Sequence, residues 1–107
     1  MDDTCCVVMV TVGDPDEAQR IASDVVKEHL AACCNMIPGV SSVFRWQGQV
    51  CREKEILLLM KTPRAKFEAL RQRVLELHSY DVPEVIALPI EKGHTPYLDW
   101  VRVETNP

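Results

Sequence analysis

The sequence lacks the short motifs that mark the common classes of enzyme. It contains no Gly-x-Gly-x-x-Gly fingerprint, no Walker lysine loop and no Gly-x-Ser-x-Gly nucleophile elbow. It also lacks the Cys-x-x-Cys and His-x-x-x-His spacings that hold many zinc ions, so spacing alone predicts no zinc site. We therefore expect a binding protein and not an enzyme.

Long apolar runs and an excess of positive charge are missing as well. The run Cys5–Val12 is too short to span a bilayer, and Asp2 and Asp3 stand where a signal peptide would carry Lys or Arg. These features predict a cytoplasmic protein with no membrane partner. The formal net charge of -4 gives an average field that repels phosphate backbones, so we expect no nucleic-acid partner.

The sequence has five cysteines, an odd number, and four of them form the adjacent pairs Cys5-Cys6 and Cys33-Cys34. Adjacent side chains on a strand point to opposite faces, so neither pair can easily bridge itself. Reduced thiols in a reducing compartment are therefore expected. Burial as small hydrophobic residues explains most of them without a metal.

Start signals and helical spacing predict three helices. Asp14-Pro15-Asp16-Glu17 has the order of an N-cap, a first-turn proline and a capping-box carboxylate. Thr62-Pro63 is expected to start a second helix and Thr95-Pro96 a short third one. The residues expected on the buried face of the first helix are Ala18, Ile21, Ala22, Val25, Val26 and His29.

Four strands complete the pattern. Cys5–Val12 and Ile56–Met60 are continuous apolar runs, typical of strands buried on both faces, and the run from Val85 to Leu88 supplies another strand. The segment from Cys33 to Lys61 is predicted to form a long hairpin, interrupted at Pro38-Gly39 and turning at Gln47-Gly48.

The resulting order is β-α-β-β-α-β followed by a short helix, which is the split βαβ pattern of an α+β, ferredoxin-like sandwich. We expect residues 1–107 to form one such domain, with two helices covering one face of a four-stranded sheet. The other face has no matching helical layer. Apolar surface is expected to remain there, and oligomerisation is the simplest way to bury it.

Polar residues gather where the second predicted helix ends. His78 is followed by Tyr80 and Glu84 within one short loop, and loops often carry binding sites. A histidine at this position also has a purely structural explanation, in which it caps the helix while Tyr80 and Glu84 tie the loop down. The local sequence leaves both interpretations open.

The predicted hairpin carries two pairs of residues that share a strand face. Glu53 and Glu55 are two residues apart, and a solvated face is the better explanation for them. Phe44 and Trp46 form an aromatic pair, and the acidic net charge favours a protein contact over stacking with a nucleotide.

One ordered set of motifs extends from about Val7 to Val101. It consists of Leu30-Ala31-Ala32-Cys33 with Asn35, Ile37-Pro38-Gly39, Trp46 with Gly48, Glu53 and Glu55, Leu59-Met60-Lys61-Thr62, His78 with Tyr80, Pro83-Glu84, and Gly93 with Tyr97-Leu98 and Trp100. This set resembles the CutA divalent-cation-tolerance family. The resemblance implies a fold similar to that of PII signalling proteins, a homotrimer whose hairpins add strands across subunits, and a role in tolerance of divalent metals, with copper binding.

The resemblance also implies a site. His78 matches the family histidine. Glu55 or Glu84 is the expected oxygen ligand of copper(II) or another divalent cation, and the sequence does not choose between them. The residues that match positions lining the family's inter-subunit cleft include both glutamates and also Cys33, Trp46, Lys61 and Tyr80.

The sequence departs from the family pattern at two ligand positions. Thr11 and Val12 stand where some members carry a cysteine, and Leu77 stands where some carry a second histidine, so copper is expected to bind weakly. Two functions remain open. One is a trimer that binds a metal or small ligand between subunits; the other is a PII-like structural or signalling trimer that acts on a protein partner without binding metal.

Overall fold

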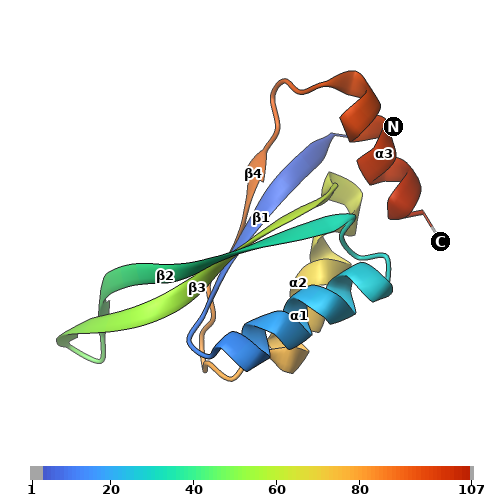
Figure 1. Cartoon of the computed structure of the whole chain (residues 1–107). Helices are drawn as coiled ribbons and strands as arrows, with labels where there is room; N and C mark the ends of the chain where they lie inside the picture. Colours follow the sequence, from blue (N-terminus) through green and yellow to red (C-terminus); the bar gives the residue numbers. More distant parts are fainter. Residues whose placement is uncertain (1–3, 107) are drawn as a thin grey trace.

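The computed structural model describes residues 4–106, and they form an antiparallel sheet with helices packed against it (Figure 1). The elements, in chain order, are β1 Cys5–Val12, α1 Pro15–Lys27, β2 Cys33–Trp46, β3 Gln49–Pro63, a 3₁₀ turn Arg64–Lys66, α2 Phe67–Leu77, β4 Val85–Pro89 and α3 Thr95–Glu104. This order confirms the predicted ferredoxin-like α+β fold with its long hairpin and C-terminal helix. Within the described range, no helix is long and apolar enough to cross a membrane.

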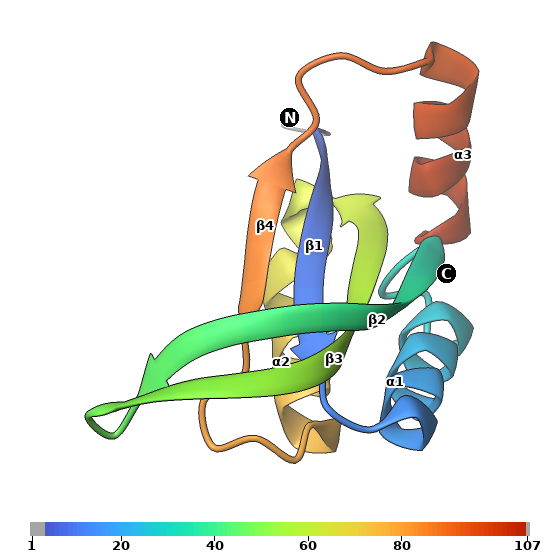
Figure 2. The same ribbon diagram turned by 60° about the vertical axis from the view of Figure 1, so that its left-hand side comes forward.

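The sheet has the strand order β2-β3-β1-β4, so β1 lies inside the sheet with a hydrogen-bonded neighbour on each side. Helices α1 and α2 lie side by side on one of its faces (Figures 1 and 2). The main core lies between these helices and the sheet. On β1, Val8 and Val10 point into it opposite Met60 and Leu58 of β3, and none of these four side chains is exposed. Alternation along both strands therefore gives one fully buried face.

Helix α1 starts as predicted but ends earlier than its apolar spacing indicates. The Asp14 carboxylate accepts a hydrogen bond from the Glu17 backbone N–H at 3.1 Å, which confirms the N-cap. The helix stops at Lys27, and His29 follows in a left-handed conformation with φ of 61°. Its ring Nδ1 donates to the Glu104 carbonyl at 2.9 Å, so the predicted place of His29 on the helix face is wrong. Val26, also predicted to be buried, is 39% exposed.

The predicted start of the second helix at Thr62-Pro63 is wrong by several residues. Both residues belong to β3, a 3₁₀ turn follows, and α2 starts only at Phe67. The fully buried Thr62 hydroxyl donates to the Leu30 carbonyl at 2.7 Å, so it is engaged in the core and does not cap a helix. The Thr-Pro pair looks like a helix start because its tertiary partner is not visible in the local sequence.

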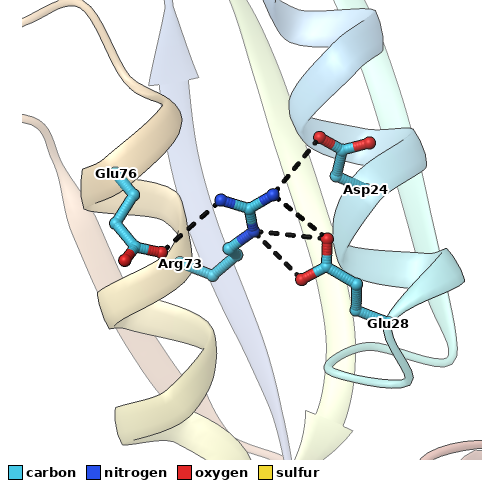
Figure 3. A network of polar contacts seen from close by, with 4 residues as sticks. All are labelled: Asp24, Glu28, Arg73 and Glu76. Atoms are coloured by element: carbon cyan, nitrogen blue, oxygen red, sulfur yellow. Dashed lines mark hydrogen bonds and ion pairs between the residues drawn. The ribbon is translucent and has the colours of Figure 1, made fainter.

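Arg73 on α2 joins the two helices of this layer (Figure 3). Glu28 follows α1 directly, and one of its carboxylate oxygens lies 3.0 Å from Nε of Arg73. The guanidinium nitrogens of Arg73 also lie 3.8 Å from a carboxylate oxygen of Asp24 and 3.5 Å from one of Glu76. The Glu28 hydrogen bond, followed by the charges of Glu28 and Glu76, raises the pKa of Arg73 above its usual value. Because all four side chains are partly exposed, the network aligns the helices but adds little stability.

Strands β2 and β3 form a hairpin that projects beyond the rest of the domain (Figures 1 and 2). Its register shifts between Ile37 and Val40, at the predicted interruption. At the tip, Gln47 and Gly48 both have positive φ, 51° and 79°, as a two-residue turn with the twist of the strands requires. The predicted turn is therefore confirmed.

The sheet face opposite α1 and α2 is covered at only one end. There α3 places Val101 against Cys5 and Ala32. Elsewhere on this face apolar side chains remain accessible, and Ile86 and Leu88 of β4 are 48% and 52% exposed. The prediction of a sheet face without a matching helical layer is confirmed.

Candidate ligand cleft

A cleft of about 910 Å³ lies between the outer half of the hairpin and the segment that joins α2 to β4. Its walls carry three aromatic side chains, Phe44, Trp46 and Tyr80, and one guanidinium, Arg45. Four carboxylates also line it: Glu53, Glu55, Asp81 and Glu84. The excess of negative charge on these walls favours a cationic occupant.

Glu55 is the most deeply buried of the four carboxylates. Only 5% of the residue is exposed, and its Oε2 accepts a hydrogen bond from the Tyr80 hydroxyl at 2.8 Å. Glu53 remains exposed on the same strand face, so the solvated face predicted for the pair is right for Glu53 and wrong for Glu55. The difference arises because the loop after α2 folds back over Glu55 but leaves Glu53 open.

Tyr80 reaches Glu55 because Gly13 leaves room for it. A Cβ atom on Gly13 would lie 2.7 Å from the Tyr80 hydroxyl oxygen, which is closer than two such atoms can approach. The ring of Tyr80 also contacts that of His78, with 4.6 Å between centroids. Desolvation, followed by the hydrogen bond to Glu55, raises the pKa of Tyr80 above its usual value, so the phenol remains a neutral donor.

His78 lies behind Tyr80, with none of its side chain exposed. It is the C-cap residue of α2, and its backbone N–H donates to Val74 at 2.9 Å. In the ring, Nδ1 accepts from the Tyr80 backbone N–H at 3.1 Å, which requires the proton on Nε2, and that nitrogen donates to the Thr11 carbonyl at 2.8 Å. His78 therefore stands at the C-cap position, and the Tyr80 hydroxyl ties the loop down through Glu55, as the structural interpretation has it; the tie expected from Glu84 is not seen among residues 4–106. Both ring nitrogens of His78 are engaged within the chain.

The residues predicted from the sequence fall into two groups. Trp46, Glu55, Tyr80 and Glu84 line the cleft, with His78 directly behind it. Cys33 and Lys61 are register partners at the opposite end of β3 and face neither the cleft nor its mouth. Lys61 is six residues from Glu55 along the strand, about 20 Å at a rise of ~3.3 Å per residue. One subunit alone does not bring the two groups together.

Sequence reasoning missed two supports of the cleft. Glu17 accepts hydrogen bonds from the backbone N–H and hydroxyl of Ser79 at 3.3 and 3.1 Å, and so ties the loop to the start of α1. Gly13 gives Tyr80 its place, as described above. Both residues had complete local explanations, Glu17 as a capping-box carboxylate and Gly13 as the end of a strand. Nothing in the sequence therefore connected either of them with the loop after α2, which lies 62 residues from Glu17 at Ser79.

The described part of the chain does not assemble the donors that a metal would need. In residues 4–106, no group of three or more His, Cys, Asp or Glu side chains is close enough to hold a metal ion. All five cysteines are free. Burial raises the pKa of Cys34 to about 12 and also raises that of Cys6, so neither supplies a thiolate at neutral pH.

The fold and the cleft define a ferredoxin-like domain with a protruding hairpin and an acidic, aromatic-walled cleft beneath it. A family model described as "CutA1 divalent ion tolerance protein" matches residues 6–104, and the chain belongs to this family. The resemblance seen in the sequence is thereby confirmed.

Two relatives and one solved structure illustrate the likeness. The "Divalent-cation tolerance protein CutA" of Thermus thermophilus is 50% identical over 100 residues, which cover 94% of this chain and 97% of that protein. "Protein CutA 1, chloroplastic" of Oryza sativa is 46% identical over 94% of this chain, but the chain spans only 56% of that longer protein. The solved structure of the divalent cation tolerance protein Cut A1 from T. thermophilus superposes with a TM-score of 0.93 at 48% identity, covering 95% of this chain and 99% of that one.

Proposed function

We propose that the protein acts in divalent metal tolerance as a homotrimer that binds a cation at the cleft between its subunits, without catalysing a reaction. The observation that carries this proposal is the acidic cleft. It lies beside a sheet face whose apolar side chains are exposed in the single chain and would be buried by another subunit. Membership of the family supplies the role in tolerance of divalent ions.

The trimer is the first part of this proposal to test. Light scattering at micromolar concentration should give three times 12.1 kDa, because the hairpin and the apolar face need a partner surface. A mass of 12.1 kDa at that concentration would refute the assembly and, with it, a cleft shared between subunits.

The proposed cation ligands are Glu55, Glu84 and His78, with copper(II) as the metal. Within residues 4–106 of one chain no three such donors lie within reach of one ion, so in this proposal the neighbouring subunit completes the site. The lone pair on Nδ1 of His78 already accepts the Tyr80 N–H, so a metal must replace that hydrogen bond. Copper is therefore expected to bind weakly.

Copper(II) titration followed by calorimetry tests this ligand set, with the accessible thiols blocked beforehand. We expect saturable binding in the wild type and a loss of affinity of at least about tenfold in His78→Ala. His94→Ala is the matched control, because His94 is exposed and lies before α3, outside the cleft lining. Equal affinity of the wild type and His78→Ala would remove His78 from the site and leave it only the capping role.

A second function is favoured by the aromatic wall of the cleft. Phe44 and Trp46 share one face of the hairpin and are 40% and 41% exposed, which suits contact with a protein partner. In this alternative the molecule is a PII-like signalling trimer that binds no metal. Titrations with copper(II), zinc and nucleotides that all give no heat would favour it over cation binding.

A cytoplasmic location is part of the same proposal. Five free thiols, two of them buried, suit a reducing compartment. The rice relative is named as chloroplastic, so related chains also occur in another compartment.

A further inference from the structure

The two faces of the projecting hairpin differ in chemistry. One carries Phe44, Trp46 and Glu53, which line the cleft. The other consists of three successive cross-strand rows, each with one cation and one neutral residue: Ser41 with Lys54, Val43 with Arg52, and Arg45 with Val50. We call these six residues the basic face. Lys54 donates to the Ser41 hydroxyl at 2.7 Å, as expected for side chains that point to the same side.

The three cations of the basic face have no carboxylate partner. Arg45, which also borders the cleft, Arg52 and Lys54 are exposed, and none of them forms an ion pair with any of residues 4–106. On α2, by contrast, Arg71 and Arg73 each lie within 4 Å of a carboxylate. Like charges in neighbouring rows of a sheet repel one another, so an anion from outside the chain would stabilise this face.

The spacing of the cations selects the shape of that anion. Successive rows on one face are two residues apart, so the cations follow one another at about 7 Å along the hairpin. One small anion is too short to contact all three. An extended peptide presents alternate side chains on one side at the same spacing of about 7 Å, so carboxylates at every second position meet one cation in each row. Val43 and Val50, 59% and 57% exposed, offer apolar contact to the methylene groups of such side chains.

Two other polyanions fit this face less well. Attachment to an anionic membrane surface combines basic residues with large apolar side chains that enter the lipid, whereas the hairpin's Phe44 and Trp46 lie on its cleft face. Single-stranded nucleic acid is held by aromatic side chains on which its bases stack, and the six residues of the basic face include no aromatic one. A peptide needs neither feature.

We propose that the basic face binds an extended acidic segment of a partner protein, with glutamate or aspartate at alternate positions. Each arginine can hold a carboxylate through two parallel hydrogen bonds, and Lys54 supplies a third positive charge. The proposal rests on neither the metal nor the trimer. It gives a protein partner a surface on the side of the hairpin opposite the aromatic wall of the cleft.

Calorimetric titration of the full chain with three capped peptides tests the spacing and the charge. The probe has four Glu-Ser repeats, the second peptide has the same residues as one block of glutamate and one of serine, and the third has glutamine in place of glutamate. We expect saturable binding of the alternating peptide, weaker binding of the block peptide and none of the glutamine peptide. Added salt should weaken the binding, because the charges are exposed.

Charge reversal locates the site. Arg52→Glu should lower the affinity for the alternating peptide about tenfold, because it removes an attraction and adds a repulsion in the middle row. Arg20→Glu is the matched control, since Arg20 is exposed on α1, away from the hairpin, and makes no ion pair within the described part of the chain. It makes the same change in net charge and should leave the affinity within about twofold.

Nuclear magnetic resonance of the wild type gives an answer that does not depend on how the variants fold. The alternating peptide should shift the backbone amide signals of residues 41–45 and 50–54 more than those of α1 and α2. No binding of that peptide, equal affinities of the wild type and Arg52→Glu, or an equal loss in Arg20→Glu overturns the proposal. So does an eight-nucleotide oligothymidylate or a phosphatidylserine vesicle that binds in an Arg52-dependent way when the peptide does not, because the face would then recognise phosphate. The light-scattering and copper experiments report on the trimer and the metal separately.

Discussion

Replacing Leu58 by alanine should lower the free energy of unfolding by about 2–5 kcal/mol. Leu58 lies in β3, is 0% exposed, and belongs to the cluster that joins the sheet to α1 and α2. Truncation removes apolar contacts and leaves a cavity between layers held on both sides, so the surroundings cannot collapse to fill it. Urea unfolding at one fixed protein concentration measures the change, because the stability of an oligomer depends on concentration.

Leu75→Ala is the control for this experiment. Leu75 has the same side chain, lies on α2 and is 38% exposed, so its truncation should change stability by less than about 1 kcal/mol. Equal losses at Leu58 and Leu75 would mean that the core between sheet and helices does not dominate the stability of the fold.

Most of the fold was predictable because its strands and helices repeat simple local patterns. The run Cys5–Val12 is apolar along nearly its whole length, which identified it as a strand of the sheet interior, although the structure buries one of its faces fully and the other only in part. The hairpin turn was predictable because Gln47-Gly48 can adopt two consecutive positive φ angles between apolar runs. These features depend on residues adjacent in sequence.

The errors occurred where a distant partner changes the meaning of a local signal. Thr62-Pro63 resembles a helix start, but the threonine hydroxyl donates a hydrogen bond to the Leu30 carbonyl and does not cap a helix. His29 continues the helical spacing, but it lies beyond the end of the helix, and its ring nitrogen donates a hydrogen bond to the Glu104 carbonyl. In both cases the decisive hydrogen bond joins segments far apart in the chain, so no local pattern could reveal it.

The candidate site was predictable in its membership but not in its geometry. Motifs identified Trp46, Glu55, Tyr80 and Glu84, which do line one cleft. They could not reveal that Tyr80 binds Glu55 across 25 residues, or that this contact buries a carboxylate expected to be solvated. That burial depends on the absence of a side chain at Gly13, a property of the packed structure and not of any motif.

Leu88→Asp should convert the proposed trimer into monomers that remain folded. Leu88 is 52% exposed in a single chain and pairs with Val7 on the open sheet face, so an aspartate there stays in water while the chain is alone. Assembly would bury that carboxylate in an apolar interface without a partner, which costs several kcal/mol per subunit and applies at every symmetry-related contact. The mass measured by light scattering should fall from three times 12.1 kDa to 12.1 kDa. Far-ultraviolet circular dichroism should remain that of the folded domain.

Leu75→Asp is the control, because it adds the same charge on α2, away from the open face, and should leave the trimer intact. A trimer that persists in Leu88→Asp would show that the subunits do not meet through this face of the sheet.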